Sequence, residues 1–168
     1  GNTEQAPPGA LPAVTFTDAV TFYWNDEKIR VQHVERAHTD GDAIIWFTGA
    51  DVVHMGDNFF VGSYPFIDVD SGGNVDGMIA AAETVLAEAG PDIRIIPGHG
   101  PVSGLEELRA FHEMLSVVRG RVQSLIDEGR SIDEVLAANP TAGYDEGMAE
   151  GFMNAERFVR LVYRSLSR

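Results

Sequence analysis

The feature that most constrains the fold is a change of hydrophobic period along the chain. From Val14 to His54 the sequence is built of short segments rich in β-branched and aromatic residues, which predict strands joined by short turns. From Val75 onward, apolar residues recur with the 3.6-residue period of a helix that buries one face. Strands are expected at 14–16, 21–24, 28–35, 43–47, 51–54 and 92–97, and long helices at 75–89 and 105–128. This order predicts an α/β fold in which helices cover a sheet.

Polar residues mark the expected helix ends. Asn74 is placed to cap the helix at 75–89, and Ser131 begins a capping-box pattern with Glu134. Asn154 precedes a final amphipathic stretch and is placed to cap it. Residues 1–13 are rich in Pro, Gly and Ala without periodicity, so they are expected to form a tail or linker before a single domain at 14–168.

Charge and cysteine content exclude several classes of function. The chain carries 12 basic and 26 acidic residues, for a net charge of −14. This balance argues against nucleic acid and anionic membranes as partners, because both require a basic surface. The absence of cysteine excludes disulfides, thiolate metal sites and cysteine nucleophiles. No signal-peptide pattern and no membrane-span pattern are visible, so a soluble protein is expected, in either the cytoplasm or the periplasm.

Three short segments place a potential metal ligand in a glycine-rich turn after an apolar stretch. They are Ala37-His38-Thr39-Asp40-Gly41-Asp42, Val53-His54-Met55-Gly56-Asp57 and Ile96-Pro97-Gly98-His99-Gly100-Pro101. Imidazole and carboxylate without thiolate is a ligand set suited to zinc, iron or manganese. Taken singly, His38 and the Gly56-Asp57 pair are better explained as turn residues. A histidine between two glycines, as at position 99, has little local structural purpose, and the three segments together indicate a site.

In combination these segments resemble the C-terminal half of the metallo-β-lactamase superfamily. The loop at 58–77 further resembles a metallo-hydrolase subgroup of that family. The resemblance implies an αββα sandwich of two similar halves, of which this chain would form the second. It also implies that His38 binds one metal, that Asp57 bridges two metals as the catalytic carboxylate, and that His99 binds the second. Water activated by the metal would then be the nucleophile.

The chain departs from the family at its most characteristic motif, His-x-His-x-Asp-His. The five histidines stand at positions 33, 38, 54, 99 and 112, too far apart to form it. We therefore expect a truncated form of a zinc-type hydrolase with an incomplete site. One zinc held by His38, Asp57 and His99, or none, would replace the one or two ions of the intact family. The substrate would be a small ester, thioester, lactone or β-lactam. The alternatives are a non-catalytic, self-associating interaction module and a binding protein with one structural metal.

Five further residues are candidates for positioning a ligand or lining a pocket: His54, Asp40, Asp42, Tyr64 and Asp68. Either aspartate beside His38 could accept a proton from its ring, although turn hydrogen bonds explain both equally well. His54 could point toward the site or into the packing. Tyr64 and Asp68 lie in the loop after Asp57, where they could line a pocket or only stabilise the loop.

The apolar runs at 43–47 and 93–96 are typical of strands buried on both faces. The helices expected at 75–89 and 105–128 can cover only one face of the sheet. A homodimer that packs sheet faces together is therefore the expected assembly. A separate N-terminal half or the tail at 1–13 would be the alternative cover.

Overall fold

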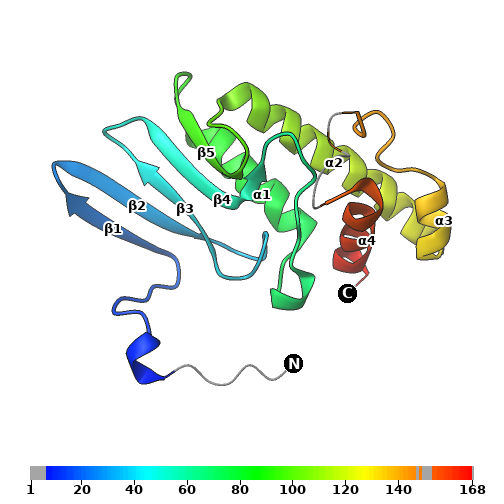
Figure 1. Ribbon diagram of the computed structural model, residues 1–168, viewed down its shortest axis with the longest axis horizontal. Helices are drawn as coiled ribbons and strands as arrows, with labels where there is room; N and C mark the ends of the chain where they lie inside the picture. The colour runs from blue at the N-terminus through cyan, green and yellow to red at the C-terminus, as the bar shows by residue number, and fades with distance from the viewer. Residues whose placement is uncertain (1–6, 147, 149–152, 168) are drawn as a thin grey trace.

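Five strands form one sheet, and the helices pack against it (Figure 1). The computed structural model describes residues 7–146, 148 and 153–167. The strands are β1 (Ala19–Trp24), β2 (Glu27–Val34), β3 (Asp42–Phe47), β4 (Val52–Phe60) and β5 (Arg94–His99). The helices are α1 (Val75–Glu88), α2 (Leu105–Asp127), α3 (Ile132–Ala137) and α4 (Ala155–Leu166), with short 3-10 turns η1 (Pro8–Ala10) and η2 (Val69–Ser71). The α/β fold predicted from the sequence is confirmed.

The sheet has the strand order β1-β2-β3-β4-β5, so each strand lies beside its neighbours in the chain. The first four strands are antiparallel, and β5 runs parallel to β4 after the crossover through α1. The register of β4 and β5 shifts twice, between His54 and Gly56 and between Gly56 and Phe60. Such irregularities redirect side chains at the end of a strand, and Asp57 lies within this stretch.

Three expected strand boundaries are wrong. Residues 14–16 are irregular and exposed, because the pairing of β1 with β2 begins only at Ala19 and an isolated segment has no partner for its backbone groups. β4 continues past His54 to Phe60, so Asp57 lies inside a strand and not in a turn. β5 extends to His99, which places that histidine at the last position of the strand.

The predicted helix caps are confirmed. The side chain of Asn74 accepts a hydrogen bond from the backbone N–H of Asp76, and that of Asn154 accepts one from Arg157. Ser131 and Glu134 form the reciprocal capping box. Each cap satisfies a backbone donor that the first helical turn leaves free. Among the described helices, none combines the length and apolar composition needed to cross a membrane.

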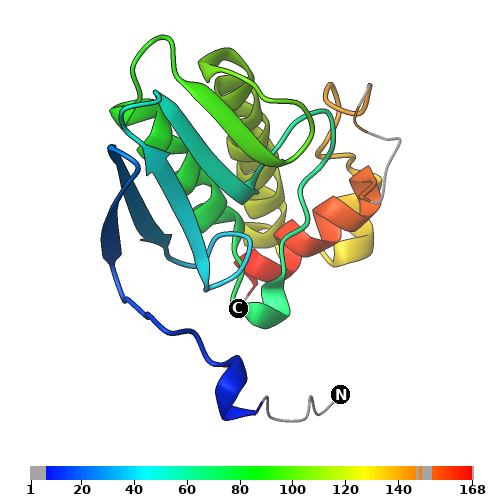
Figure 2. The same cartoon turned by 60° about the vertical axis from the view of Figure 1, so that its left-hand side comes forward.

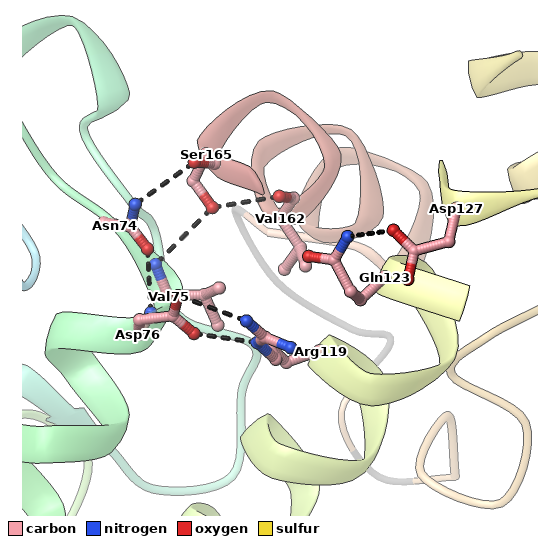
Figure 3. A network of polar contacts seen from close by, with 8 residues as sticks. All are labelled: Asn74, Val75, Asp76, Arg119, Gln123, Asp127, Val162 and Ser165. Atoms are coloured by element: carbon pink, nitrogen blue, oxygen red, sulfur yellow. Dashed lines mark hydrogen bonds and ion pairs between the residues drawn. The ribbon is translucent and has the colours of Figure 1, made fainter. Parts of the chain in front are cut away.

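A polar network joins the beginning of α1 to two other helices (Figure 3). The Asn74 amide donates to the carbonyl of Ser165 in α4 at 3.1 Å. Arg119 in α2 donates through Nε to the Asp76 carboxylate at 2.8 Å. The loop that precedes α1 carries part of the candidate site, so this network fixes one end of that loop to the helical layer.

The two faces of the sheet differ in cover. α1 and α2 lie on the same side of the sheet in both views (Figures 1 and 2). On that side Ile44, Val53, Met55 and Ile95 are fully buried. The residues that alternate with these face the opposite side, as does Val31 of β2, which pairs with Ile45. In the single chain the apolar residues of that side are only half-buried: Val31, Ile45, Phe47, Val52 and Ile96. β3 is therefore buried on one face only, not on both.

Candidate metal centre

The structure brings His38, Asp57 and His99 together at one end of β4 and β5. Asp57 lies between the two imidazoles, with its Oδ2 atom 3.5 Å from Nε2 of His38 and its Oδ1 atom 3.4 Å from Nε2 of His99. His38 comes from the loop between β2 and β3, Asp57 from β4 and His99 from the end of β5. The predicted convergence of the three side chains is thus present, while their role as metal ligands stays a prediction.

The close approach of β5 to Asp57 depends on a glycine. A Cβ atom at Gly98 would lie 2.1 Å from Oδ1 of Asp57 and 2.7 Å from the backbone carbon of Gly56. Any side chain at this position would have to displace the carboxylate and the neighbouring strand. Gly98 therefore has a specific purpose, which is to let the end of β5 reach Asp57.

His38 is held in one orientation by the loop that follows β4. Its Nδ1 atom lies 2.8 Å from the carbonyl oxygen of Phe66, and since a carbonyl can only accept, Nδ1 carries the hydrogen. In the neutral ring, Nε2 then presents its lone pair toward Asp57. The backbone of His38 is also fixed, by the Asn58 side chain at 3.4 Å and by the N–H of Asp68 at 2.9 Å.

His99 is less constrained than His38. Its side chain is 63% exposed, against 15% for that of His38. The ring stacks on Phe60 with centroids 4.9 Å apart and planes 18° apart. Stacking sets the plane of the imidazole, but within the described part of the chain no hydrogen bond holds its second nitrogen. The two imidazoles therefore differ in how firmly they are presented to Asp57.

The donor chemistry and spacing of these pairs suit a metal of the zinc type. Two ligands on a tetrahedral zinc, each about 2.0–2.1 Å from the ion, are about 3.3 Å apart. Each imidazole nitrogen stands at nearly this distance from one carboxylate oxygen. Asp57 can thus take part in two ligand pairs, one with His38 and one with His99, as a bridging carboxylate would.

A single zinc held by all three side chains does not fit this geometry. Within the described residues, no three His, Cys, Asp or Glu side chains are arranged to hold one metal ion together. Because the two imidazoles approach opposite oxygens of Asp57, the ligands form two pairs and not one triad. Each position would need further ligands to complete a coordination shell.

A pocket of about 390 Å³ opens beside the three side chains. Besides His38, Asp57 and His99, it is lined by Phe60, Ser63, Tyr64, Phe66 and Met153. Pockets of this size are typical of sites for small organic molecules. The polar end is the His-Asp-His group, and the remaining walls are mainly apolar.

Tyr64 lines this pocket, as one of the two readings of the sequence proposed. Its hydroxyl donates to Oδ1 of Asp145 at 3.0 Å, and its ring stacks on Phe158 of α4 at 4.9 Å. Burial, reinforced by the hydrogen bond to Asp145, raises the pKa of Tyr64 well above its usual value. The phenol therefore stays protonated near neutral pH and forms a wall of the pocket.

The other four candidates lie outside the pocket lining. Asp42 accepts a hydrogen bond from the backbone N–H of Thr39, and the His38 ring donates to Phe66, not to either neighbouring aspartate. Asp40 contacts His33 through its backbone carbonyl. His54 accepts from the N–H of Gly56. These hydrogen bonds stabilise the local turn and strand structure and do not place Asp40, Asp42 or His54 in the pocket.

Asp68 caps the short turn η2, and the hydrogen bond from Ser71 lowers the pKa of its carboxyl group. Its backbone N–H donates to the carbonyl of His38, and His38 contributes electrostatically to the lowered pKa of the Asp68 carboxyl group. Asp68 therefore supports the loop that holds His38 and is not part of the pocket lining.

Several residues of the site were not singled out from the sequence. Asn58 follows Asp57 directly and is 1% exposed; its amide joins the backbone of Met55 to that of His38. Phe60 and Phe66 contact the two imidazoles, but their apolar character alone does not distinguish a pocket wall from the core. The one sequence feature that could have pointed to these residues is Asn58, a polar side chain next to the apolar residues that follow it.

Comparison with known proteins defines the class of fold. No protein-family profile and no curated protein matches the chain. Among solved structures, the inverting sec-alkylsulfatase Pisa1 from Pseudomonas sp. is 14% identical, with a TM-score of 0.71 over 92% of this chain and 26% of that chain. A metallo-beta-lactamase from Pontibacter korlensis is 17% identical, with a TM-score of 0.51 over 62% of this chain and 49% of that one.

These likenesses confirm the metallo-β-lactamase-like fold that the sequence motifs predicted. This chain spans about a quarter of the alkylsulfatase and about half of the metallo-beta-lactamase. At such low identity the comparison establishes the fold, and the activity is a separate question.

Proposed function

We propose that this chain carries part of the active site of a metal-dependent hydrolase of the metallo-β-lactamase type. Asp57 would bridge two metal positions, with His38 completing one ligand pair and His99 the other. The observation that carries the proposal is the placement of one imidazole nitrogen opposite each oxygen of the same carboxylate, at 3.5 and 3.4 Å. The likeness to a metallo-beta-lactamase in fold supports it.

A bound metal of this type would lower the pKa of a water molecule and polarise the bond to be broken. The residues of this chain would position that chemistry. The carbonyl of Phe66 orients the His38 ring by accepting its Nδ1 hydrogen. Gly98 lets the strand end that carries His99 approach Asp57. Phe60 and Phe66 place apolar surface against the two imidazoles.

The bond broken would be an ester, thioester, lactone or β-lactam. Because each metal position has only two ligands from the described residues, we expect weaker metal affinity than in a complete site. We also expect little or no turnover by this chain alone, unless a second chain or segment supplies further ligands.

Zinc retention tests the proposal. The protein is loaded with zinc, dialysed, and analysed for bound metal. His38→Ala and His99→Ala should each lower the retained zinc to about half, since each removes one of the two ligands at one of the two proposed positions. His112→Ala is the matched control, because His112 contacts Glu83 on the surface of the helices and lies outside the site. Zinc content that is the same in all three variants would refute the metal centre.

One observation favours a second candidate function, that of a self-associating interaction module. The sheet face opposite α1 and α2 is apolar and half-buried in the single chain, with Val31, Ile45 and Ile96 on it. A second copy of the chain could cover this face without any catalysis. The mass of the protein in solution, together with the zinc measurement, separates the two functions.

A further inference from the structure

The walls of the site pocket are apolar and tightly packed. Phe60, Tyr64 and Met153 line it and are 8%, 1% and 4% exposed. Phe66 also lines it and contacts the His38 ring edge-on at 5.8 Å. Apolar surface therefore begins directly at the two imidazoles and continues away from Asp57.

Among the described residues, the pocket lining offers no lysine or arginine that could pair with a negatively charged group of a bound molecule. Two arginines of neighbouring elements are engaged elsewhere, Arg164 with Asp70 at 2.7 Å and Arg121 with the carbonyls of Pro140 and Ala142. Asp145 accepts a hydrogen bond from Tyr64, so the charged group that contacts this wall is negative. A carboxylate or phosphate placed among these walls would lose its hydration without gaining a partner.

We propose that the pocket binds the uncharged apolar group, alkyl or aryl, of an ester-type substrate. This inference rests on the proposed function, because the His-Asp-His end is where the scissile bond would lie. It narrows the substrate class to simple esters, thioesters and lactones. β-Lactams are disfavoured, since their fused ring carries a carboxylate close to the bond that breaks.

A titration of the metal-free protein tests the inference independently of metal binding. The probes are 1-butanol, 1-hexanol and 1-octanol, which represent the alcohol part of an ester, and 8-hydroxyoctanoate, which adds a carboxylate to the same chain. Binding is followed by NMR through the methyl signal of Met153 and the ring signals of Phe60 and Phe66. Affinity should rise about fourfold with each methylene that enters the pocket. The hydroxyoctanoate should bind at least tenfold more weakly than octanol.

A charge variant sharpens the test. Ser63 lines the pocket, so Ser63→Arg supplies the missing cation and should remove most of the discrimination against the carboxylate. Ser124→Arg is the matched control, because it adds the same charge at an exposed position of α2 away from this pocket. It should leave the ratio of the two affinities unchanged.

The titration with alcohols and hydroxyoctanoate has two kinds of outcome. Chain-length-dependent binding at Met153, with the charged probe excluded, supports it. Affinity independent of chain length, equal binding of the charged probe, or shifts confined to other residues would overturn it. Loss of zinc retention in the histidine variants has no bearing on this titration, so failure of the metal centre and failure of the substrate class are distinguishable.

Discussion

The two faces of the sheet are similar in composition and different in environment. On the side of the sheet that α1 and α2 cover, Met55 and Ile95 are fully buried. On the opposite side, Val31, Ile45 and Ile96 are equally apolar but only half-buried. Apolar character along a strand therefore shows that a face can be covered, while the packing of the helices decides which face is covered. The candidate site lies at the ends of β4 and β5, at the edge where the two faces of the sheet meet.

Neighbouring isoleucines of β5 give the most direct test of this difference. Ile95 is fully buried and Ile96 is half-buried, because successive side chains of a strand point to opposite faces. Ile95→Ala should lower the free energy of unfolding by about 2–5 kcal/mol, through lost burial and a cavity. Ile96→Ala should lower it by less than about 1.5 kcal/mol in the monomer. Urea unfolding measures both, and equal losses at low protein concentration would contradict the comparison.

A charge on the open face tests whether a second copy covers it. We propose that the chain forms a homodimer through this face, with Ile45 near its centre between Val31 and His54. Light scattering should then give a dimer mass at micromolar concentration. Ile45→Lys should weaken association at least a hundredfold, or about 2.7 kcal/mol, by burying an unpaired charge.

The matched control for the dimer is Ser124→Lys, which adds the same charge at an exposed position of α2, on the side of the sheet opposite the open face. It should leave the mass unchanged. A wild-type protein that is monomeric at tens of micromolar would remove the dimer proposal and leave the open face for another partner.

Gly98→Ala tests the strand end at which the site lies. The added Cβ would collide with Asp57 and the backbone of Gly56, so the variant should lose about 1–3 kcal/mol of stability and most of its zinc retention. Gly120→Ala is the control within α2, where a Cβ meets no atom within 4 Å. It should be neutral or stabilising by up to about 1 kcal/mol. Similar effects of the two substitutions would show that the close approach at Gly98 is not needed.

The smallest expected effect concerns Tyr64, which attaches the loop after β4 to the helical layer. Tyr64→Phe should cost about 1 kcal/mol near neutral pH, because Asp145 loses a hydrogen-bond donor. Burial raises the pKa of Tyr64 in the folded protein, so the unfolded chain releases its proton first. The stabilisation is thus complete below about pH 10 and is lost as the pH rises further.

Unfolding followed from pH 8 to 11 measures this dependence. The difference between wild type and Tyr64→Phe should shrink at the alkaline end. A difference that stays constant with pH would mean that the Tyr64 phenol titrates alike in the folded and unfolded chain.

The sequence by itself determined those features that depend on local pattern. The period of apolar residues located α1 and α2 almost to the residue, because one buried helix face imposes that period. Asn74, Ser131 and Asn154 marked helix beginnings, since a side-chain acceptor at a cap satisfies a free backbone N–H within a few residues. The three side chains that the structure brings together were also singled out, because Asp57 and His99 stand beside glycines at the ends of apolar stretches and His38 precedes the turn at Gly41.

Only the tertiary structure decided how these parts meet. The length of β4, and hence the place of Asp57 inside a strand, depends on pairing with β5, whose residues lie far along the chain. The division of the three candidate ligands into two pairs follows from the direction in which each ring approaches Asp57. Phe60 and Phe66 became pocket walls, and one face of β3 became the covered one, through contacts between distant segments. Local pattern carries no information about such contacts, because an apolar side chain gains the same free energy from any apolar neighbour.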